Sequence, residues 1–320
     1  MPVIATNQPW LAPLAGFSDL PFRLLCREQG CSLAYTEMVS AKGLVLGSKT
    51  WELLQTHAKD SPLVVQLFGS DASYLVRAME LLLEQGYGLF DLNAGCAMRK
   101  VTKTGAGAGL LLEPEKLLRL AGEMVRLAGP GRVGVKLRTG WDREQEVYLQ
   151  LAGRLQDVGA GWVTLHPRTA RQGFSGQADW SRLKELQERV SLPVIGSGDL
   201  FTAEQGLSCL RQTGIAGVMF ARGALANPCI FREFKDLLAG CGQAARQGGQ
   251  ESDQGLQEIK DIALRHISLC REHSLQPRAF FRMRTVIPRY LKGMHGAKEL
   301  RSRIVACRDW QELQELLQGI

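Results

Sequence analysis

The sequence predicts an α/β protein, a (β/α)8 TIM barrel followed by a small all-α C-terminal domain. Eight short apolar runs of strand length recur between residues 10 and 223, and helical patterns lie between them. A Gly- and Gln-rich segment at 239–255 follows the last run, and amphipathic helical patterns come after it. The alternative is an open doubly wound sheet, but no glycine-rich turn follows the first run, LAPLAGFSD.

The eight runs are apolar on both faces, as expected of parallel strands buried in a barrel. In chain order they are WLAPLAG, LAYTEM, LVVQLFG, LFDLN, VGVKLR, WVTLHPR, PVIGSGD and GVMFARG. Among the intervening helices, PEKLLRLAGEMVRLAG has proline in its first turn, and EVYLQLAGRLQDVGAG ends on glycine. The string GAGAGL at 105–110 lacks the third glycine of a dinucleotide-binding fingerprint, so we interpret it as a loop that enters a helix.

These patterns place a barrel domain at 1–238, a linker at 239–255 and a helical domain at 256–320. The helical domain is predicted from LQEIKDIALRHISLCREH, FRMRTVIPRYLKGM and DWQELQELLQGI. Between Lys260 and Arg308 twelve basic residues face three acidic ones, so this window carries +9 while the whole chain carries +7. Such a local excess favours a polyanionic partner.

The composition also limits the class of protein. No apolar stretch is long enough to span a membrane, and the N-terminus lacks the pattern of a secretory signal. The eight cysteines are scattered, without a CxxC pair or a Cys/His metal spacing, which predicts reduced thiols in the cytoplasm. Cys26 and Cys31 are expected to be core or loop thiols. These features predict neither a metal site nor a membrane partner, and we expect a monomer.

Polar groups follow most of the predicted strands. The strand ends carry Ala12 with Pro13, Glu37, Gln66, Asn93, Lys136 with Arg138, His166, Ser197 with Gly198, and Ala221 with Arg222. Because barrel sites lie at the carboxyl ends of the strands, we expect a shared pocket there. The last two loops, GSGDL and ARGAL, are placed where barrels bind phosphate, although ordinary glycine turns would give the same letters. Lys136 lies among apolar residues, where a lysine either forms a Schiff base or stabilises charge on a cofactor.

Several segments together resemble one known family. LAPLAGFSDLPFR, TEM, VVQLFGS, DLNAGCAMRKV, VKLRTGW, LHPRTARQGFSGQADW, SGD and MFARGAL appear in order. They are similar to the tRNA-dihydrouridine synthase family, most of all to its bacterial members. The similarity runs from about Leu11 to Arg303, and the NxGC, KxRTGW and HPRT segments are jointly specific.

The resemblance implies a barrel that binds FMN. Pro13, Leu14 and Ala15 would pass under the flavin ring, and Gln66 would hydrogen-bond its edge. Lys136 would stabilise negative charge in the reduced flavin. The phosphate would be surrounded by His166, Ser197, Gly198, Asp199, Ala221 and Arg222. NADPH, with NADH as the alternative, would reduce the flavin.

The resemblance also implies a substrate and a reaction. Reduced flavin would deliver hydride to C6 of a tRNA uridine, and Cys96 would give the proton to C5, because a thiol is mostly protonated at neutral pH. Asn93 and Arg138 would contact the uracil. Arg99 and Lys100 would promote loss of the thiol proton, so we expect them to point away from the sulfur or toward RNA phosphate. The helical domain would contact phosphates through Arg282, Arg284, Arg289, Lys292, Arg301 and Arg303.

The match departs from the family pattern at three positions. Proline normally follows the catalytic cysteine, and here the residue is Ala97. Ser197 replaces an asparagine and Ala221 a glycine, changes that leave the backbone amides in place. Because alanine leaves the cysteine loop freer than proline does, a tRNA-binding protein with weakened or lost catalysis is one alternative. A flavin enzyme acting on a free pyrimidine is another, and an aldolase using Lys136 is a third.

Overall fold

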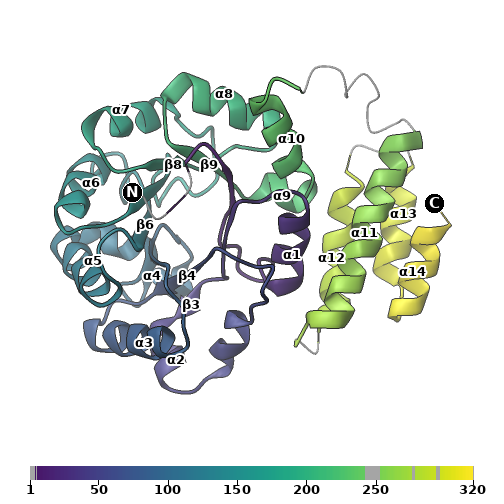
Figure 1. Cartoon of the computed structure of the whole chain (residues 1–320), viewed down its shortest axis with the longest axis horizontal. Helices are drawn as coiled ribbons and strands as arrows, with labels where there is room; N and C mark the ends of the chain where they lie inside the picture. Colours follow the sequence, from purple (N-terminus) through teal and green to yellow (C-terminus); the bar gives the residue numbers. More distant parts are fainter. Residues whose placement is uncertain (1–3, 5, 242–252, 276–277, 293–295, 320) are drawn as a thin grey trace.

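The computed structural model describes residues 4, 6–241, 253–275, 278–292 and 296–319. Two bodies are visible in it: a ring of helices around a barrel of strands, and a group of helices at one side (Figure 1). The group of helices packs beside α1 (Leu20–Glu28), at the N-terminal part of the barrel. Among the described helices, none is both long enough and apolar enough to cross a membrane.

The barrel contains all eight predicted strands. They are β1 (Pro9–Leu11), β2 (Leu33–Tyr35), β4 (Leu63–Phe68), β5 (Phe90–Ala94), β6 (Val133–Arg138), β7 (Trp162–His166), β8 (Val194–Gly196) and β9 (Gly217–Phe220). Neighbours pair in parallel in the order β2-β1-β9-β8-β7-β6-β5-β4, and the β2–β4 pairing closes the ring. The predicted barrel is thus confirmed, with one addition, the two-residue strand β3 (Val39–Ser40) beside the end of β4.

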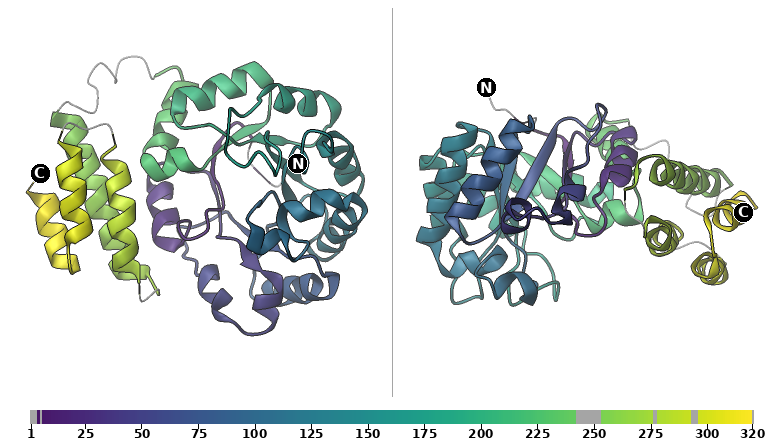
Figure 2. Two further views of the ribbon diagram at one scale, coloured as in Figure 1. Left: turned by 180° about the vertical axis from the view of Figure 1, so that it is seen from behind. Right: turned by 90° about the horizontal axis from the view of Figure 1, so that it is seen from below.

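Helices follow the strands around the outside of the ring (Figure 2). The longer ones are α1, α3 (Ala72–Glu84), α5 (Pro114–Ala128), α6 (Tyr148–Asp157), α7 (Ser181–Arg189), α8 (Ala203–Thr213) and α10 (Ile230–Leu238). The shorter ones are α2 (Ala41–Val45), η1 (Lys49–Leu54), α4 (Arg99–Thr102), η2 (Gly107–Leu112) and α9 (Arg222–Ala226). Both helices predicted from their patterns are present, and the GAGAGL string leads into η2 as expected.

The inward-pointing side chains of the strands fill the interior of the barrel below the carboxyl ends of the strands. A cluster that includes Trp10, Tyr35 and Trp162 is fully buried there, and the Trp162 indole N–H donates to the Tyr35 hydroxyl at 2.8 Å. Gly134 faces this cluster, since a Cβ atom on it would lie 2.1 Å from the Trp162 ring. Met219 belongs both to the cluster and to the wall of the cavity described below. The apolar packing therefore forms a floor and leaves the strands' carboxyl ends for a site.

Four described helices make up the C-terminal group: α11 (Asp253–His273), α12 (Ala279–Tyr290), α13 (Ala297–Ala306) and α14 (Trp310–Gln318). Helices α11, α12 and α14 correspond to the predicted patterns, whereas α13 was not predicted. Its segment AKELRSRIVA buries only Ala297 and Ile304, too few positions for a clear apolar stripe. Helix α11 begins inside the predicted linker, and residues 242–252 of that linker lie outside the described residues.

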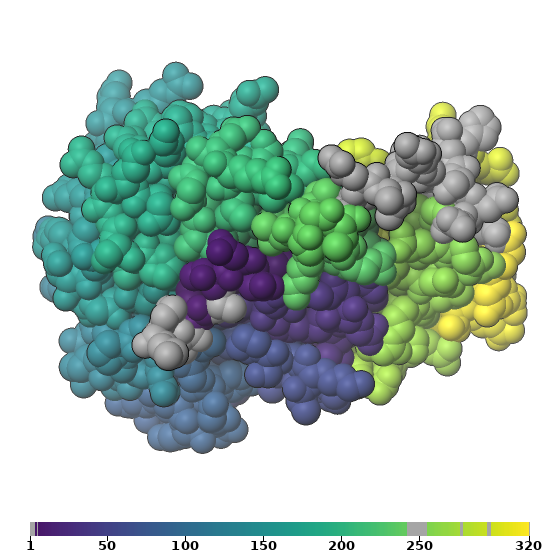
Figure 3. Space-filling model, turned by 45° about the horizontal axis from the view of Figure 1, so that its top comes forward, coloured from purple at the N-terminus to yellow at the C-terminus, as the bar shows by residue number. Residues whose placement is uncertain are grey.

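The helical group contacts the barrel mainly through α1 and the loop before it, and also through α9, α10 and Gln55 after η1. Arg265 on α11 pairs with Glu28 at 2.5 Å, and the Gln55 amide donates to the His273 carbonyl at 2.6 Å. Arg282 on α12 forms a largely buried ion pair with Asp19. In the space-filling view the helical group lies directly against the purple N-terminal part of the barrel (Figure 3).

Candidate functional site

A cavity of about 440 Å³ opens at the carboxyl ends of the strands. Fourteen of the residues predicted from the sequence line it: Ala12, Pro13, Leu14, Ala15, Asn93, Cys96, Lys136, Arg138, His166, Ser197, Gly198, Asp199, Ala221 and Arg222. Glu37 and Gln66 do not line it, and neither do Arg99 and Lys100. The strand-end residues are thus brought together, except for Glu37 and Gln66, which are buried beneath the wall.

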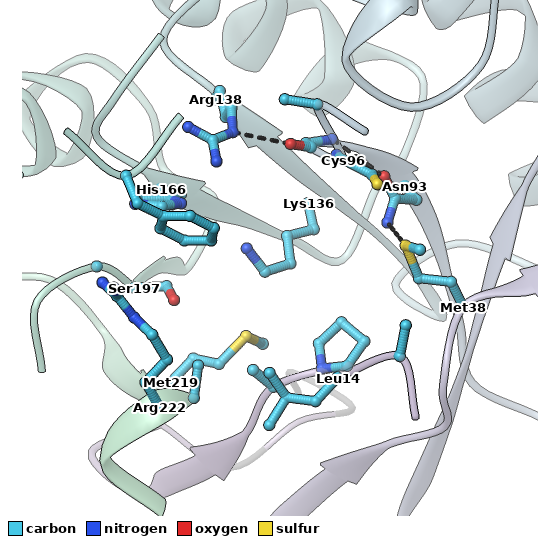
Figure 4. A pocket seen from close by; sticks show the side chains of 18 of the residues that line it. Leu14, Met38, Asn93, Cys96, Lys136, Arg138, His166, Ser197, Met219 and Arg222 are labelled. Carbon is cyan, nitrogen blue, oxygen red and sulfur yellow. Dashed lines mark hydrogen bonds between the residues drawn. The ribbon is translucent and has the colours of Figure 1, made fainter. Parts of the chain in front are cut away.

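The cavity has two chemically different sides (Figure 4). Leu14, Met38 and Met219 contribute an apolar side, while Lys136 reaches into the space opposite them. Arg138 and Arg222 add two further cationic groups to the wall. A flat ring with an apolar face and a negatively charged edge or tail would be complementary to this arrangement.

Lys136 carries a charge at the edge of the apolar interior. Burial, followed by the positive charge of Arg138, lowers the pKa of its ammonium to about 8, although Asp91 and Cys96 oppose this shift. The ammonium has no hydrogen bond or ion pair among the described residues. A partly desolvated cation without a protein partner is well suited to an anionic group of a ligand.

Arg138 binds the loops around the cavity. Its Nε donates to the Gly95 carbonyl at 2.8 Å, and its Nη1 donates to the carbonyls of Thr169 and Gly173, both at 2.9 Å. Burial and then the neighbouring Arg168 lower its pKa to about 10, so it is charged at neutral pH. The guanidinium therefore ties the Cys96 loop to the loop after β7 and still faces the cavity.

Arg168 was not predicted as a site residue. It holds Asp199 in place on the side of the cavity formed by the predicted phosphate loops. It is fully buried and makes a two-pronged ion pair with Asp199 at 2.6 and 2.8 Å. Partial burial favours the neutral acid, but the hydrogen bonds from Arg168 lower the pKa of Asp199. Arg168 also donates to His166 Nε2 at 3.3 Å. Burial and the surrounding cations lower the pKa of His166, so this imidazole is neutral.

Glycine is required in the loop after β8. Gly198 has φ of +111°, and a Cβ atom there would lie 2.7 Å from the His166 ring. A Cβ atom on Gly223 would lie 2.5 Å from the Leu200 carbonyl oxygen. The two predicted phosphate loops thus pack tightly together, and Arg222 at their junction pairs with Asp199 at 3.2 Å.

The Cys96 loop is held from both sides. Asn93 Oδ1 accepts the backbone N–H groups of Gly95 at 3.2 Å and Cys96 at 3.0 Å, and the Cys96 carbonyl accepts the N–H of Ala108 at 2.9 Å. Cys96 is partly exposed at the cavity wall. Arg99 is exposed on α4, as is Lys100, so these two cations point away from the cavity.

Gly107→Ala is expected to disturb this loop. Gly107 has φ of +59°, and a Cβ atom would lie 2.6 Å from the Cys96 carbonyl oxygen. We expect the free energy of unfolding to fall by ~1–3 kcal/mol and the alkylation rate of Cys96 to change. Gly122→Ala is the matched control, because no atom lies within 4 Å of its Cβ position. Equal melting temperatures and alkylation rates in the two variants would contradict the expectation.

Gln66 lies below the cavity wall instead of facing the open space. It is fully buried, its Nε2 donates to Asp91 Oδ2 at 2.8 Å, and its Oε1 accepts from Asn93 Nδ2 at 2.8 Å. Asn93 also donates to the Met38 sulfur at 3.0 Å. The hydrogen-bonding atoms of Asn93 are therefore engaged inside the protein, which favours a role in shaping the loop.

Exposed apolar side chains surround the cavity mouth, and the sequence did not single them out. Met98 is 58% exposed, Phe174 63% and Phe201 44%, and all three line the cavity. The Arg222 guanidinium lies over both aromatic rings, 4.6 Å from the centre of Phe174 and 4.8 Å from that of Phe201. These rings give a ligand an apolar rim next to a cation.

The basic residues predicted on the helical domain do not share one environment. Arg282 forms an ion pair with Asp19 and donates to the Gly16 carbonyl at 3.4 Å. Its position therefore fits a contact with the barrel and not a contact with phosphate. The other five, Arg284, Arg289, Lys292, Arg301 and Arg303, have no carboxylate partner among the described residues. Arg289 lies over the Phe17 ring at 5.0 Å, next to the barrel loop that leads from the cavity.

The cysteines other than Cys96 do not form a site. Cys26, Cys31, Cys209, Cys229, Cys270 and Cys307 are buried, and Cys241 is exposed. Burial raises the pKa of Cys31 to about 11, so this thiol is protonated in the core. In the described part of the chain, no group of three His, Cys, Asp or Glu residues could hold a metal ion.

Two solved enzyme structures have a fold similar to that of this chain. Morphinone reductase aligns with a TM-score of 0.56 and 15% identity, covering 73% of this chain and 87% of that one. The old yellow enzyme homologue from Zymomonas mobilis aligns with a TM-score of 0.53 and 12% identity, covering 73% and 91%. At this identity the similarity establishes the barrel fold alone.

Sequence comparison reaches almost the whole chain. The family model described as "Dihydrouridine synthase (Dus)" matches residues 10–320. The probable tRNA-dihydrouridine synthase of Treponema pallidum is 33% identical over 314 residues, covering 95% of this chain and 90% of that protein. Probable tRNA-dihydrouridine synthase 1 of Synechocystis sp. is 32% identical over 307 residues, covering 96% and 84%.

Proposed function

Because the chain belongs to the dihydrouridine synthase family, we propose that it reduces the C5=C6 bond of specific tRNA uridines to 5,6-dihydrouridine, with FMN as cofactor and NADPH as electron donor. The observation that carries the proposal is the placement on one cavity wall of a thiol, Cys96, and of Lys136, which has no partner in the described chain. The proposal includes a cytoplasmic location, because tRNA is modified there. NADH is the alternative donor.

The cavity fits a flavin in shape and charge. Pro13, Leu14 and Ala15 supply an apolar surface for the ring, and Met219 supplies another part of it. Lys136 would lie at the negatively charged edge of the ring. The tight loops at Gly198 and Gly223 with Arg222 would hold the phosphate, and Arg168 would keep Asp199 from repelling it.

Cys96 would complete the reaction on the substrate. When bound, reduced flavin would supply the hydride for C6 of the uracil. Cys96 would donate its thiol proton to C5, where negative charge develops. Asn93 holds the cysteine loop, and Arg138 presents a cation beside it that can donate a hydrogen bond to a uracil carbonyl oxygen. The neutral His166 adds no positive charge that would draw the proton from the thiol.

The helical domain would bind the RNA backbone. Arg284, Arg289, Lys292, Arg301 and Arg303 would contribute salt-dependent phosphate contacts with little sequence reading. A uridine must leave its stack to reach the cavity, and the aromatic rim at Phe174 and Phe201 offers it a surface on the way. A reductase of a free pyrimidine would not need these features.

A tRNA-binding protein with weakened catalysis is a second candidate. Ala97 lies directly on the cavity wall where the family normally has proline. The loop next to it is nevertheless fixed by the Asn93 side chain and the Ala108 amide, so proline is not needed to hold the thiol in place. This favours the active enzyme.

One anaerobic experiment tests the proposal. The flavin of the purified protein is reduced with NADPH, the excess is removed, and flavin absorbance is followed after adding tRNA transcribed without modifications. We expect reoxidation by this tRNA at a rate that falls as salt rises. Fully modified tRNA from cells is the matched control and should leave the flavin reduced.

The other outcomes separate the alternatives. Reoxidation by free uracil or uridine as fast as by tRNA would replace the proposal with a pyrimidine reductase. A flavin that stays reduced while tRNA is retained on a filter would identify the non-catalytic binder, and Ala97→Pro would then be the rescue to try. A colourless protein that binds no flavin would contradict the proposal at its first step.

A further inference from the structure

A continuous chain of hydrogen bonds joins the buried Asp91 to the backbone of Cys96. Asp91 Oδ2 accepts from Gln66 Nε2 at 2.8 Å, and Gln66 Oε1 accepts from Asn93 Nδ2 at 2.8 Å. Asn93 Oδ1 accepts the Cys96 N–H at 3.0 Å. Asp91 and Gln66 are fully buried, and Asp91 does not line the cavity.

The sheet places these side chains next to one another. Gln66 on β4 is the register partner of Asp91 on β5, so their side chains emerge side by side. Asn93 follows two residues after Asp91 on the same strand and therefore points to the same face. Gln66, Asp91 and Asn93 all lie on strands, and only Cys96, the last member of the hydrogen-bond chain, lies on a loop.

The direction of the chain is set by its end at the loop. A backbone N–H can only donate, so Asn93 must present its oxygen to Cys96 and its amide nitrogen to Gln66. Gln66 must then accept with its oxygen and donate with its nitrogen. The residue at 91 must in turn be an acceptor, and a carboxylate oxygen meets that requirement.

The acceptor role of Asp91 does not require its negative charge. Burial raises the pKa of Asp91 to about 7, with Gln66 and Lys136 opposing the shift. Its Oδ1 has no hydrogen-bond partner among the described residues, so a proton can occupy Oδ1 while Oδ2 still accepts from Gln66. The same arrangement is available to asparagine.

We propose that Asp91 is a positioning residue for Cys96, acting through the fixed amide orientations of Gln66 and Asn93. The structural part stands on the hydrogen bonds themselves, whereas its catalytic consequence rests on the proposed function. Losing the acceptor at 91 frees the Gln66 amide to rotate, which removes the hydrogen bond that holds Asn93 in the orientation needed at Cys96.

The first test measures the loop without any reaction. In a Cys241→Ser background, Cys96 is the one described thiol that is not buried, and iodoacetamide labelling of the flavin-free protein reports on it. Asp91→Leu is expected to speed labelling by roughly five- to tenfold, as expected for the loss of one hydrogen bond. Asp91→Asn keeps an acceptor and is expected to label at the parent rate. Labelling at the parent rate in both variants would overturn the proposal. Faster labelling than in the parent in both variants would also overturn it, because the change in Cys96 labelling would then follow from the charge at position 91.

The second test measures proton delivery. Asp91→Leu is expected to slow tRNA-dependent flavin reoxidation by roughly tenfold to a hundredfold, with Asp91→Asn close to the parent. Flavin reduction by NADPH and retention of tRNA on a filter should stay the same in all three. If the parent does not react with tRNA, the proposed function fails while the labelling contrast still decides the positioning role.

A pair of variants keeps the test decisive if Asp91→Leu does not fold. Gln66→Glu replaces the amide donor with a second carboxyl group facing Asp91. Adding Asp91→Asn restores a hydrogen bond, because the new amide at position 91 can donate to the new carboxylate at position 66. We expect fast labelling of Cys96 in Gln66→Glu and the parent rate in the double variant. A double variant that labels as fast as Gln66→Glu would overturn the proposal.

Discussion

Replacing Cys96 with alanine is expected to slow tRNA-dependent flavin reoxidation by roughly 10²- to 10⁴-fold, the usual contribution of a general acid. The thiol lies on the cavity wall, and it is the one partly exposed cysteine of the barrel loops in the described chain. FMN content and reduction by NADPH should not change, because the ring and phosphate contacts proposed above do not involve the sulfur. Stopped-flow absorbance under anaerobic conditions measures both half-reactions.

Two control variants define what this result means. Cys241→Ala removes an exposed thiol just after α10 and should react like the parent. Cys96→Ser should be nearly as slow as Cys96→Ala, since a hydroxyl is a much weaker acid than a thiol. Full activity in Cys96→Ala would end the general-acid assignment, and full activity in Cys96→Ser alone would reduce it to a requirement for a polar group.

The barrel could be predicted from the sequence because each strand is buried on both faces. Runs such as VGVKLR and GVMFARG are apolar over most of their length, and in a chain with helices between the runs this pattern is typical of buried parallel strands. Helix α13 escaped prediction because its contacts bury two positions in ten residues. Strand β3 escaped because two residues make no period.

The site was predictable where strand ends decide the position. Lys136, His166 and Ser197 reach the cavity because the carboxyl ends of parallel strands meet there. Gln66 also comes from a strand, but its neighbour in the sheet, Asp91, draws the amide into the interior. Sequence alone does not reveal such cross-strand partners without the register.

Residues on loops were harder to predict. Arg168 and Phe174 both lie in the loop after β7, whose path follows from hydrogen bonds and not from periodicity. The available signal was an arginine shortly after the strand and an aromatic residue between glycine and serine, which is weak on its own. Arg282 was assigned to RNA because its partner Asp19 lies 263 positions away in the chain.

Replacing Lys136 with methionine is expected to weaken FMN binding by ~1.5–3 kcal/mol, about tenfold or more, because a charge-assisted contact to the cofactor is lost. The apoprotein should become more stable at pH 7, since burial lowers the pKa of this ammonium to about 8 and the folded state bears the cost of its charge. Fluorescence titration with FMN measures the affinity, and thermal unfolding of the flavin-free protein measures the stability.

The pH dependence separates this effect from simple loss of packing. Above pH 8 the folded parent releases the Lys136 proton while the unfolded chain keeps it to about 10.5, so the parent's stability should rise over this range and the variant's should not. FMN affinity of the parent should fall between about pH 7 and 9, with no such slope in Lys136→Met. Lys100→Met, on the exposed helix α4, is the control and should match the parent. An equal pH slope in all three proteins would remove Lys136 from the cofactor site, because the slope is expected to come from the titration of its ammonium.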